Sequence, residues 1–156
     1  MVGWSFAATP LLLRSNLNHM NVTRVEFTEA AEAMLRKLYP FHKMGFMFHQ
    51  SGGCCDGSSP MCYEAGEFRV GGSDVLMQTL HVDGIEQPIK FYMSLEQFEL
   101  WKHTHLTIDC IPGRGAGFSL EAPEGFRFHT RSRLFTDEES RNMPEVFLGS
   151  GELLSL

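Results

Sequence analysis

The chain has 156 residues, enough for one domain with a buried core. Its 13 basic and 19 acidic side chains give a formal net charge of −6, which argues against nucleic acid as the partner. Hydrophobic residues make up 43% of the chain, but no apolar run approaches the ~20 residues that a membrane helix needs, so we expect no membrane partner.

The first residues carry no clear structural pattern. Thr9-Pro10 interrupts their apolar part, and Arg14 comes too late for the basic start of a signal peptide. We therefore expect residues 1–21 to form a flexible extension and the protein to be cytoplasmic.

An amphipathic helix is predicted over residues 29–38. Thr28 is a suitable N-cap, apolar residues recur at helical spacing, and Pro40 ends the segment. A strand over 46–49 follows, in which Phe46 and Phe48 share one face while Met47 and His49 share the other.

The rest of the pattern is rich in strands. Ser94 and Gln97 match a capping box that opens a short helix through about His103. Strands are predicted over residues 75–82, 89–93, 106–111, 118–121 and 126–135. One early and one mid-chain helix among short strands indicate an α+β, mainly β fold. We expect a single globular domain over 22–139 and a C-terminal tail over 140–156.

A cysteine-rich loop follows the first long strand. It contains Cys54, Cys55 and Cys62, and His49 lies just upstream. In a reducing compartment crowded thiols favour ligands or redox groups over structural disulfides. Thiolates and imidazole suit zinc, iron or an iron–sulfur cluster, so these four residues form a candidate metal site. Two alternatives stay open: a nucleophilic thiol at Cys54 or Cys55, and cysteines that only pack.

The strand over 126–134 places cationic or titratable side chains on one face by strict alternation. These side chains are Arg127, His129, Arg131 and Arg133. They either pair with carboxylates or form a strip that binds an anion or a partner. The carboxylates that we consider for this pairing are Glu121, Glu124 and Asp137.

Four motifs carry a family resemblance. They are S-G-G-C-C-D-G at 51–57, W-K-H-T at 101–104, P-G-R-G at 112–115 and G-F-S-L-E at 117–121, followed by R-S-R-L-F at 131–135. With them the chain resembles the bacterial domain-of-unknown-function family numbered 779 from about Val22 to about Glu139. Members are often encoded beside aldehyde dehydrogenases, so the resemblance implies an accessory role in aldehyde or alcohol oxidation, with a dehydrogenase as partner.

A looser resemblance concerns the A-type iron–sulfur carriers, the HesB-like proteins. The order of a helix, a strand, Gly52-Gly53-Cys54, further strands and residues 117–123 is similar to theirs. It implies a compact pseudo-barrel or sandwich of short strands that holds iron or a cluster through thiolates. Only Cys54 matches their ligands, because residues 127–131 replace their C-terminal cysteine pair.

These observations support three functions. The first is an accessory protein that binds metal or a cluster and serves the dehydrogenase by maturation, delivery or chaperoning. The second is a thiol-dependent enzyme or redox protein acting on aldehydes or disulfides. The third is a structural partner subunit without chemistry. We expect an accessory protein rather than an enzyme, and no nucleotide cofactor, because the sequence contains no dinucleotide fingerprint. A monomer and a homodimer both stay open.

Overall fold

The computed structural model describes residues 21–52, 60–115 and 117–155. Predictions for residues 1–20, for Cys54 and for Cys55 lie outside these ranges. The α-helices are α2 (Glu29–Leu38), α3 (Leu95–Trp101) and α4 (Asp137–Arg141), and 3₁₀ helices cover Tyr39–Phe41 and Ala122–Glu124. The strands are β1 (Val25–Phe27), β2 (Phe46–Gln50), β3 (Met61–Glu64), β4 (Val75–Leu80), β5 (Ile89–Met93), β6 (Thr104–Pro112), β7 (Phe126–Leu134) and β8 (Phe147–Leu148).

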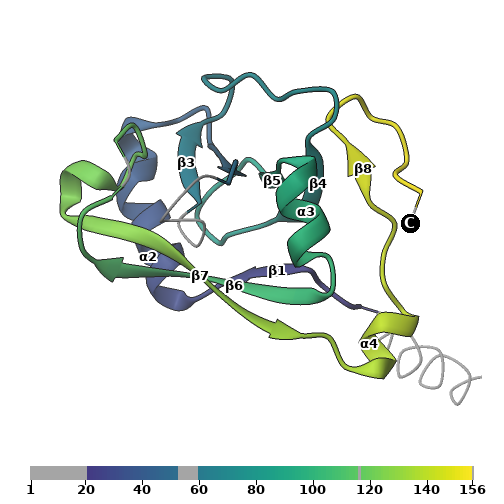
Figure 1. Ribbon diagram of the computed structural model, residues 1–156. Helices are drawn as coiled ribbons and strands as arrows, with labels where there is room; N and C mark the ends of the chain where they lie inside the picture. The colour runs from purple at the N-terminus through teal and green to yellow at the C-terminus, as the bar shows by residue number, and fades with distance from the viewer. Residues whose placement is uncertain (1–20, 53–59, 116, 156) are drawn as a thin grey trace, which may run out of the picture.

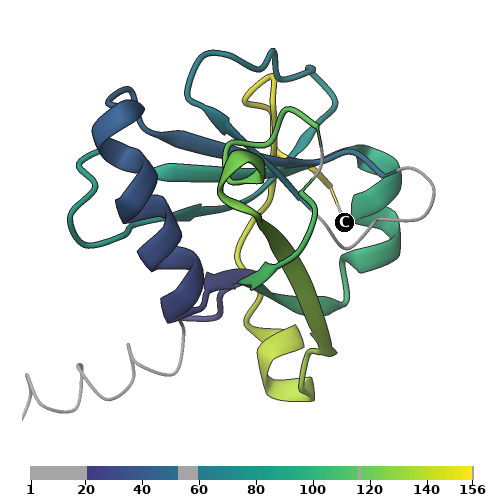
Figure 2. The same cartoon turned by 90° about the vertical axis from the view of Figure 1, so that its left-hand side faces the viewer.

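The strands form two sheets. One has the order β1-β6-β7, and the other has the order β3-β2-β5-β4-β8. In the second sheet β2 is parallel to β5 and antiparallel to β3. Figures 1 and 2 show the sheets as two layers, with α2 along one side and α4 following the end of β7. The α+β, mainly β prediction is confirmed, and the sheets do not close into a barrel.

Phe48 lies at the centre of the core between the sheets. It is fully buried, and its ring lies 4.9 Å from that of Phe128 and 5.8 Å from that of Phe91. Phe27 of β1 lies 5.3 Å away, measured between ring centroids. One aromatic side chain of β2 therefore contacts both sheets. Helix α2 packs against the edge of this core through its buried residues Ala31, Met34, Leu35 and Leu38.

Strand β2 is buried on both faces along its whole length. Its inner face carries Phe46 and Phe48, as predicted, and its outer face carries Met47 and His49. The segment after β3 covers the outer face, because the Phe68 ring lies 4.7 Å from the His49 ring. A histidine side chain is thus held in a nearly dry environment beside the start of the cysteine-rich loop.

Local signals in the sequence predict helices α2 and α3. Helix α2 has the predicted bounds, and the Thr28 hydroxyl accepts a hydrogen bond from the Ala31 amide. At α3 the Ser94 hydroxyl caps the Gln97 amide as predicted. The Gln97 side chain does not complete the capping box; its carbonyl oxygen accepts from the Trp101 indole instead.

Two predictions about the chain after residue 115 are wrong in detail. Residues 118–121 form turns rather than a strand, although the Leu120 amide donates to the Cys62 carbonyl at the edge of β3. The segment 140–156, expected as a tail, contains the end of α4 and all of β8, and β8 pairs with β4. Val146 is buried, so this segment is part of the fold. Of the helices in the described ranges, none is long and apolar enough to cross a membrane.

Candidate functional site

His49 is the sequence-predicted site residue with the most constrained surroundings. It lies near the end of β2 and is 5% exposed. Its Nδ1 lies 2.8 Å from the hydroxyl oxygen of Ser51, which leads into the cysteine-rich loop. Its Nε2 lies 3.0 Å from Oδ2 of Asp74. The imidazole therefore connects the beginning of that loop to a carboxylate from a distant segment.

The C-terminal segment holds Asp74 in place. The Gly149 amide donates to the Asp74 carbonyl oxygen at 2.6 Å, and the Ser150 amide donates to the Gly72 carbonyl oxygen at 3.2 Å. The Gly71 amide also donates to Oδ2 of Asp74 at 2.8 Å. Backbone hydrogen bonds, rather than a flexible side-chain contact, thus fix the carboxylate opposite His49.

Nε2 of His49 is buried and has no aligned hydrogen bond, although the Asp74 oxygen is only 3.0 Å away. A buried imidazole nitrogen and a partly buried carboxylate oxygen at this separation repel each other unless a proton or a cation lies between them. Zinc bonds of about 2.0–2.2 Å to nitrogen and oxygen place neighbouring ligand atoms roughly 3–3.5 Å apart. The distance between Nε2 of His49 and Oδ2 of Asp74 therefore suits two ligand atoms of one cation. The contact between Nδ1 and Ser51 orients the imidazole ring.

Cys62, another predicted ligand, is not brought to this pair. Cys62 lies opposite Phe48 in the β2–β3 register, so it faces the core while His49 faces the other side of the sheet. Within the described ranges no group of three His, Cys, Asp or Glu side chains is placed to hold a metal ion. Cys54 and Cys55 lie outside these ranges, and Cys62 belongs to a different cluster.

That cluster is a buried polar group between the sheets, formed by Cys62, Cys110, Ser119 and Glu121. Burial, followed by the nearby Glu121 and Cys110, raises the pKa of Cys62 well above its usual value. Burial also raises the pKa of Cys110, to about 11. Both thiols are therefore protonated at neutral pH, which disfavours them as nucleophiles or metal ligands.

Glu121 is the charged member of this buried cluster. It accepts hydrogen bonds from the Ser119 hydroxyl and from the Phe128 amide. Burial raises the pKa of Glu121 above its ordinary value, and these two hydrogen bonds oppose the rise without cancelling it. The folded protein therefore holds this proton more tightly than the unfolded chain does.

This difference predicts a pH dependence of stability. The contribution of Glu121 is fully present below its unfolded pKa and is lost as pH rises through the folded pKa. We expect Glu121→Gln to gain stability relative to wild type between pH 4.5 and pH 7.5, because glutamine cannot ionise. Urea unfolding of both proteins across this pH range measures the difference between their free energies of unfolding. Groups that titrate alike in both proteins do not contribute to this difference. A difference that stays constant, or that falls with pH, would contradict the prediction.

The cationic face of β7 forms as predicted, because β6 and β7 pair without a bulge. Pairing with carboxylates is found, but not with the expected ones. Arg131 lies 3.1 Å from Asp109, and Arg133 makes two 2.9 Å hydrogen bonds with Glu139. Among the carboxylates considered above, Glu124 instead pairs with Lys37 of α2. Two of the four side chains on this face, Arg131 and Arg133, therefore have carboxylate partners. Binding of an anion or a partner by Arg127 and His129 stays a prediction.

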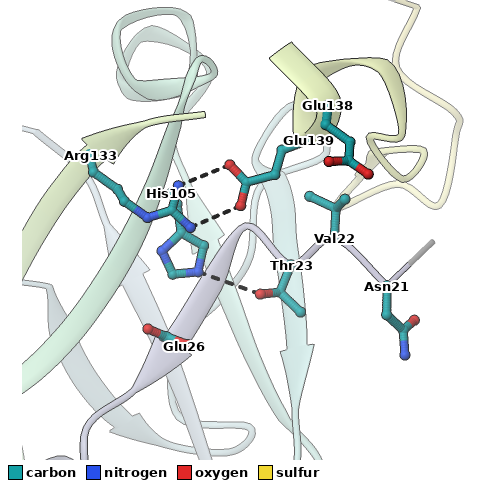
Figure 3. A pocket seen from close by; sticks show the side chains of 8 residues that line it. All are labelled: Asn21, Val22, Thr23, Glu26, His105, Arg133, Glu138 and Glu139. Atoms are coloured by element: carbon teal, nitrogen blue, oxygen red, sulfur yellow. Dashed lines mark hydrogen bonds and ion pairs between the residues drawn. The ribbon is translucent and has the colours of Figure 1, made fainter. Parts of the chain in front are cut away.

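A cavity of about 300 Å³ lies where β1, β6, β7 and α4 meet (Figure 3). His105 is 5% exposed beside it; its Nε2 lies 3.4 Å from the Thr23 hydroxyl, and its Nδ1 has no hydrogen-bond partner. Burial lowers the pKa of His105. The Arg133 guanidinium beside it is already paired with Glu139. The sequence gives no signal for this cavity, because its residues come from segments far apart in the chain.

Comparison with known families gives one match. The family described as Domain of unknown function (DUF779) matches residues 34–134. The chain belongs to this family. The matched span runs from α2 to the end of β7 and contains His49, Asp74, Cys62 and Glu121. A comparison with the curated proteins found no match. The predicted membership is therefore confirmed, and the C-terminal segment that holds Asp74 lies beyond the matched span.

Proposed function

We propose that the protein is a small accessory protein that binds a metal ion or an iron–sulfur species. The site consists of His49, Asp74 and the cysteine-rich loop. The observation that carries this proposal is the buried Nε2 of His49, 3.0 Å from a carboxylate oxygen and without an aligned hydrogen bond. Zinc and iron are the ions that a mixed nitrogen, oxygen and sulfur donor set suits.

Chain length allows the loop to supply the sulfur donors. Cys54 follows Ser51 by three residues, a reach of at most about 11 Å, and Cys55 follows directly. Ser51 itself contacts the His49 ring. Cys54 and Cys55 are therefore the proposed thiolate ligands, and Cys62 is withdrawn from the set because it faces the core.

The proposed setting is an aldehyde or alcohol dehydrogenase system in the cytoplasm. The sequence resemblance implies the dehydrogenase partner, and the crowded thiols suit a reducing compartment. A bound metal or cluster would be cargo for delivery to the dehydrogenase or would support its maturation. The looser similarity to the A-type carriers agrees with this role.

Metal analysis tests the proposal. Protein purified anaerobically without an affinity tag is analysed for zinc, iron and acid-labile sulfide, before and after anaerobic reconstitution. We expect near-stoichiometric metal in wild type and a loss in His49→Gln, Cys54→Ser and Cys55→Ser. Asp74→Asn should weaken metal binding by about 10- to 100-fold if the carboxylate only supports the histidine, and by more if it is a ligand.

Two variants serve as matched controls. Cys110→Ala removes a buried thiol from the core cluster, and His129→Gln removes a histidine from the outer face of β7. Both should keep the wild-type metal content. Folded wild-type protein that stays metal-free after reconstitution would overturn the proposal, as would equal metal loss in the controls.

Thiol chemistry is the second candidate function. The contacts of His49 with Asp74 and Ser51 would equally allow the imidazole to accept a proton from a neighbouring thiol. This candidate predicts metal-free protein with one fast-alkylating cysteine, lost in Cys54→Ser or Cys55→Ser and slowed in His49→Gln. Co-purification with a dehydrogenase, without metal or a reactive thiol, would instead support a structural partner subunit.

A further inference from the structure

A partly open cavity of about 260 Å³ lies on the outer face of the five-stranded sheet. It is bounded by β2, β5 and the segment that follows β3. Its lining is mixed in polarity, and its apolar part includes Met47, Phe68, Val70, Pro88 and Tyr92. The volume is just below the usual range for ligand sites, so the cavity suits a small molecule with a compact apolar part.

Lys90 provides a positive charge at this cavity. Its side chain is exposed, and β2–β5 register places it opposite Met47 on the outer face. Among the ion pairs formed by the described residues, none involves Lys90. An ammonium that forms no ion pair with a described carboxylate, next to the apolar side chains of this lining, favours an anionic ligand.

Tyr92 also lines the cavity. Its phenol can donate a hydrogen bond to a bound ligand. Tyr92 and Lys90 are two residues apart on one strand and point to the same face. The Asp74 carboxylate lies near Tyr92 and would repel an anion, so the anionic end of a ligand belongs at Lys90.

We propose that this cavity binds a small monocarboxylate whose apolar or aromatic part contacts Phe68 and Tyr92 and whose carboxylate contacts Lys90. The site lies beside His49, because Phe68 also packs on the His49 ring. It does not depend on the metal proposed above, since none of its lining residues is a proposed ligand. Its recognition rests on apolar contact together with one charge-assisted interaction.

Benzoate and its neutral analogue benzamide test the proposal. Titrations of the metal-free full-length protein are followed by ¹H–¹⁵N NMR. We expect saturable shifts at residues of β5 and of the segment around Phe68, with benzoate binding about tenfold more tightly than benzamide. Lys90→Met should remove this preference and leave benzamide binding unchanged, because only the carboxylate contact is lost.

Two further variants make the outcome decisive. Lys37→Met is the matched control, because it removes a lysine from α2 that is paired with Glu124. It should bind benzoate as wild type does. Ala65→Leu adds volume at the cavity wall and should abolish binding of both probes. Absence of saturable benzoate binding, equal affinity for both probes in wild type, or the same loss in Lys37→Met would overturn the proposal. The metal content of Lys90→Met should remain at the wild-type value, which separates this test from the metal test.

Discussion

Phe48→Ala is expected to lower the free energy of unfolding by about 3–5 kcal/mol, a typical cost for truncating a buried phenylalanine. The side chain is fully buried and contacts the rings of Phe27, Phe91 and Phe128, which come from both sheets. Its removal leaves a cavity between two sheets that are each fixed by their own hydrogen bonds. Such a site collapses poorly, so the expected loss is at the upper end for core truncations.

Equilibrium urea unfolding of wild type and variant measures this loss. Phe41→Ala is the matched control, because the Phe41 side chain is 80% exposed at the end of the 3₁₀ helix. It should change stability by no more than about 0.5 kcal/mol. If Phe48→Ala cost as little as the control, the two sheets would not share the core described above.

Gly149→Ala is expected to lower stability by about 1–3 kcal/mol, the usual cost of overpacking. A Cβ atom at residue 149 would overlap the Gly71 carbonyl oxygen and would lie 2.8 Å from Cγ1 of Val70. A backbone carbonyl cannot rotate away as a flexible side chain can. The variant must therefore separate the C-terminal segment from the segment before β4, which also weakens the Gly149 hydrogen bond to Asp74.

Thermal unfolding measures the loss of stability, and amide hydrogen exchange measures the weaker contact between the C-terminal segment and the segment before β4. We expect a lower melting temperature and faster exchange of the Gly71 and Asp74 amides. Gly117→Ala is the control, because a Cβ atom there meets no heavy atom within 4 Å. Unchanged exchange at Gly71 in Gly149→Ala would show that the C-terminal segment does not hold Asp74.

Helices α2 and α3 and the long strands of this fold were predicted from local sequence signals. Thr28 caps α2 and Pro40 ends it, and both effects depend on residues within a single turn. Period-2 alternation likewise gives the faces of β2 and β7. Such signals depend only on residues that are close together in the sequence, and the structure agrees with them.

Elements that depend on distant partners were missed. Strand β8 has only two residues and forms because β4 offers a free edge. Residues 118–121 alternate like a strand, yet the buried Ser119 and Glu121 form a polar cluster with Cys62 instead. Alternation alone cannot distinguish a strand from an irregular segment that buries two polar side chains.

Three of the four proposed site residues, His49, Cys54 and Cys55, were visible in the sequence. His49 was identified from its place before the cysteine-rich loop, whereas its partner Asp74 lies 25 residues further along the chain. Only the pairing of β4 with β5, and of β5 with β2, brings the two together. Strand register also separates Cys62 from His49, a distinction that spacing in the sequence could not make.

X-ray absorption spectroscopy at the metal edge of the reconstituted protein is the most direct test of the proposed site. The account predicts sulfur ligands at about 2.3 Å together with nitrogen or oxygen ligands at about 2.0–2.2 Å for zinc. The metal that the variants retain after reconstitution with excess metal should lack one nitrogen ligand in His49→Gln and one sulfur ligand in Cys54→Ser or Cys55→Ser. A spectrum without sulfur ligands, or one that is identical in wild type and His49→Gln, would contradict the site that we propose.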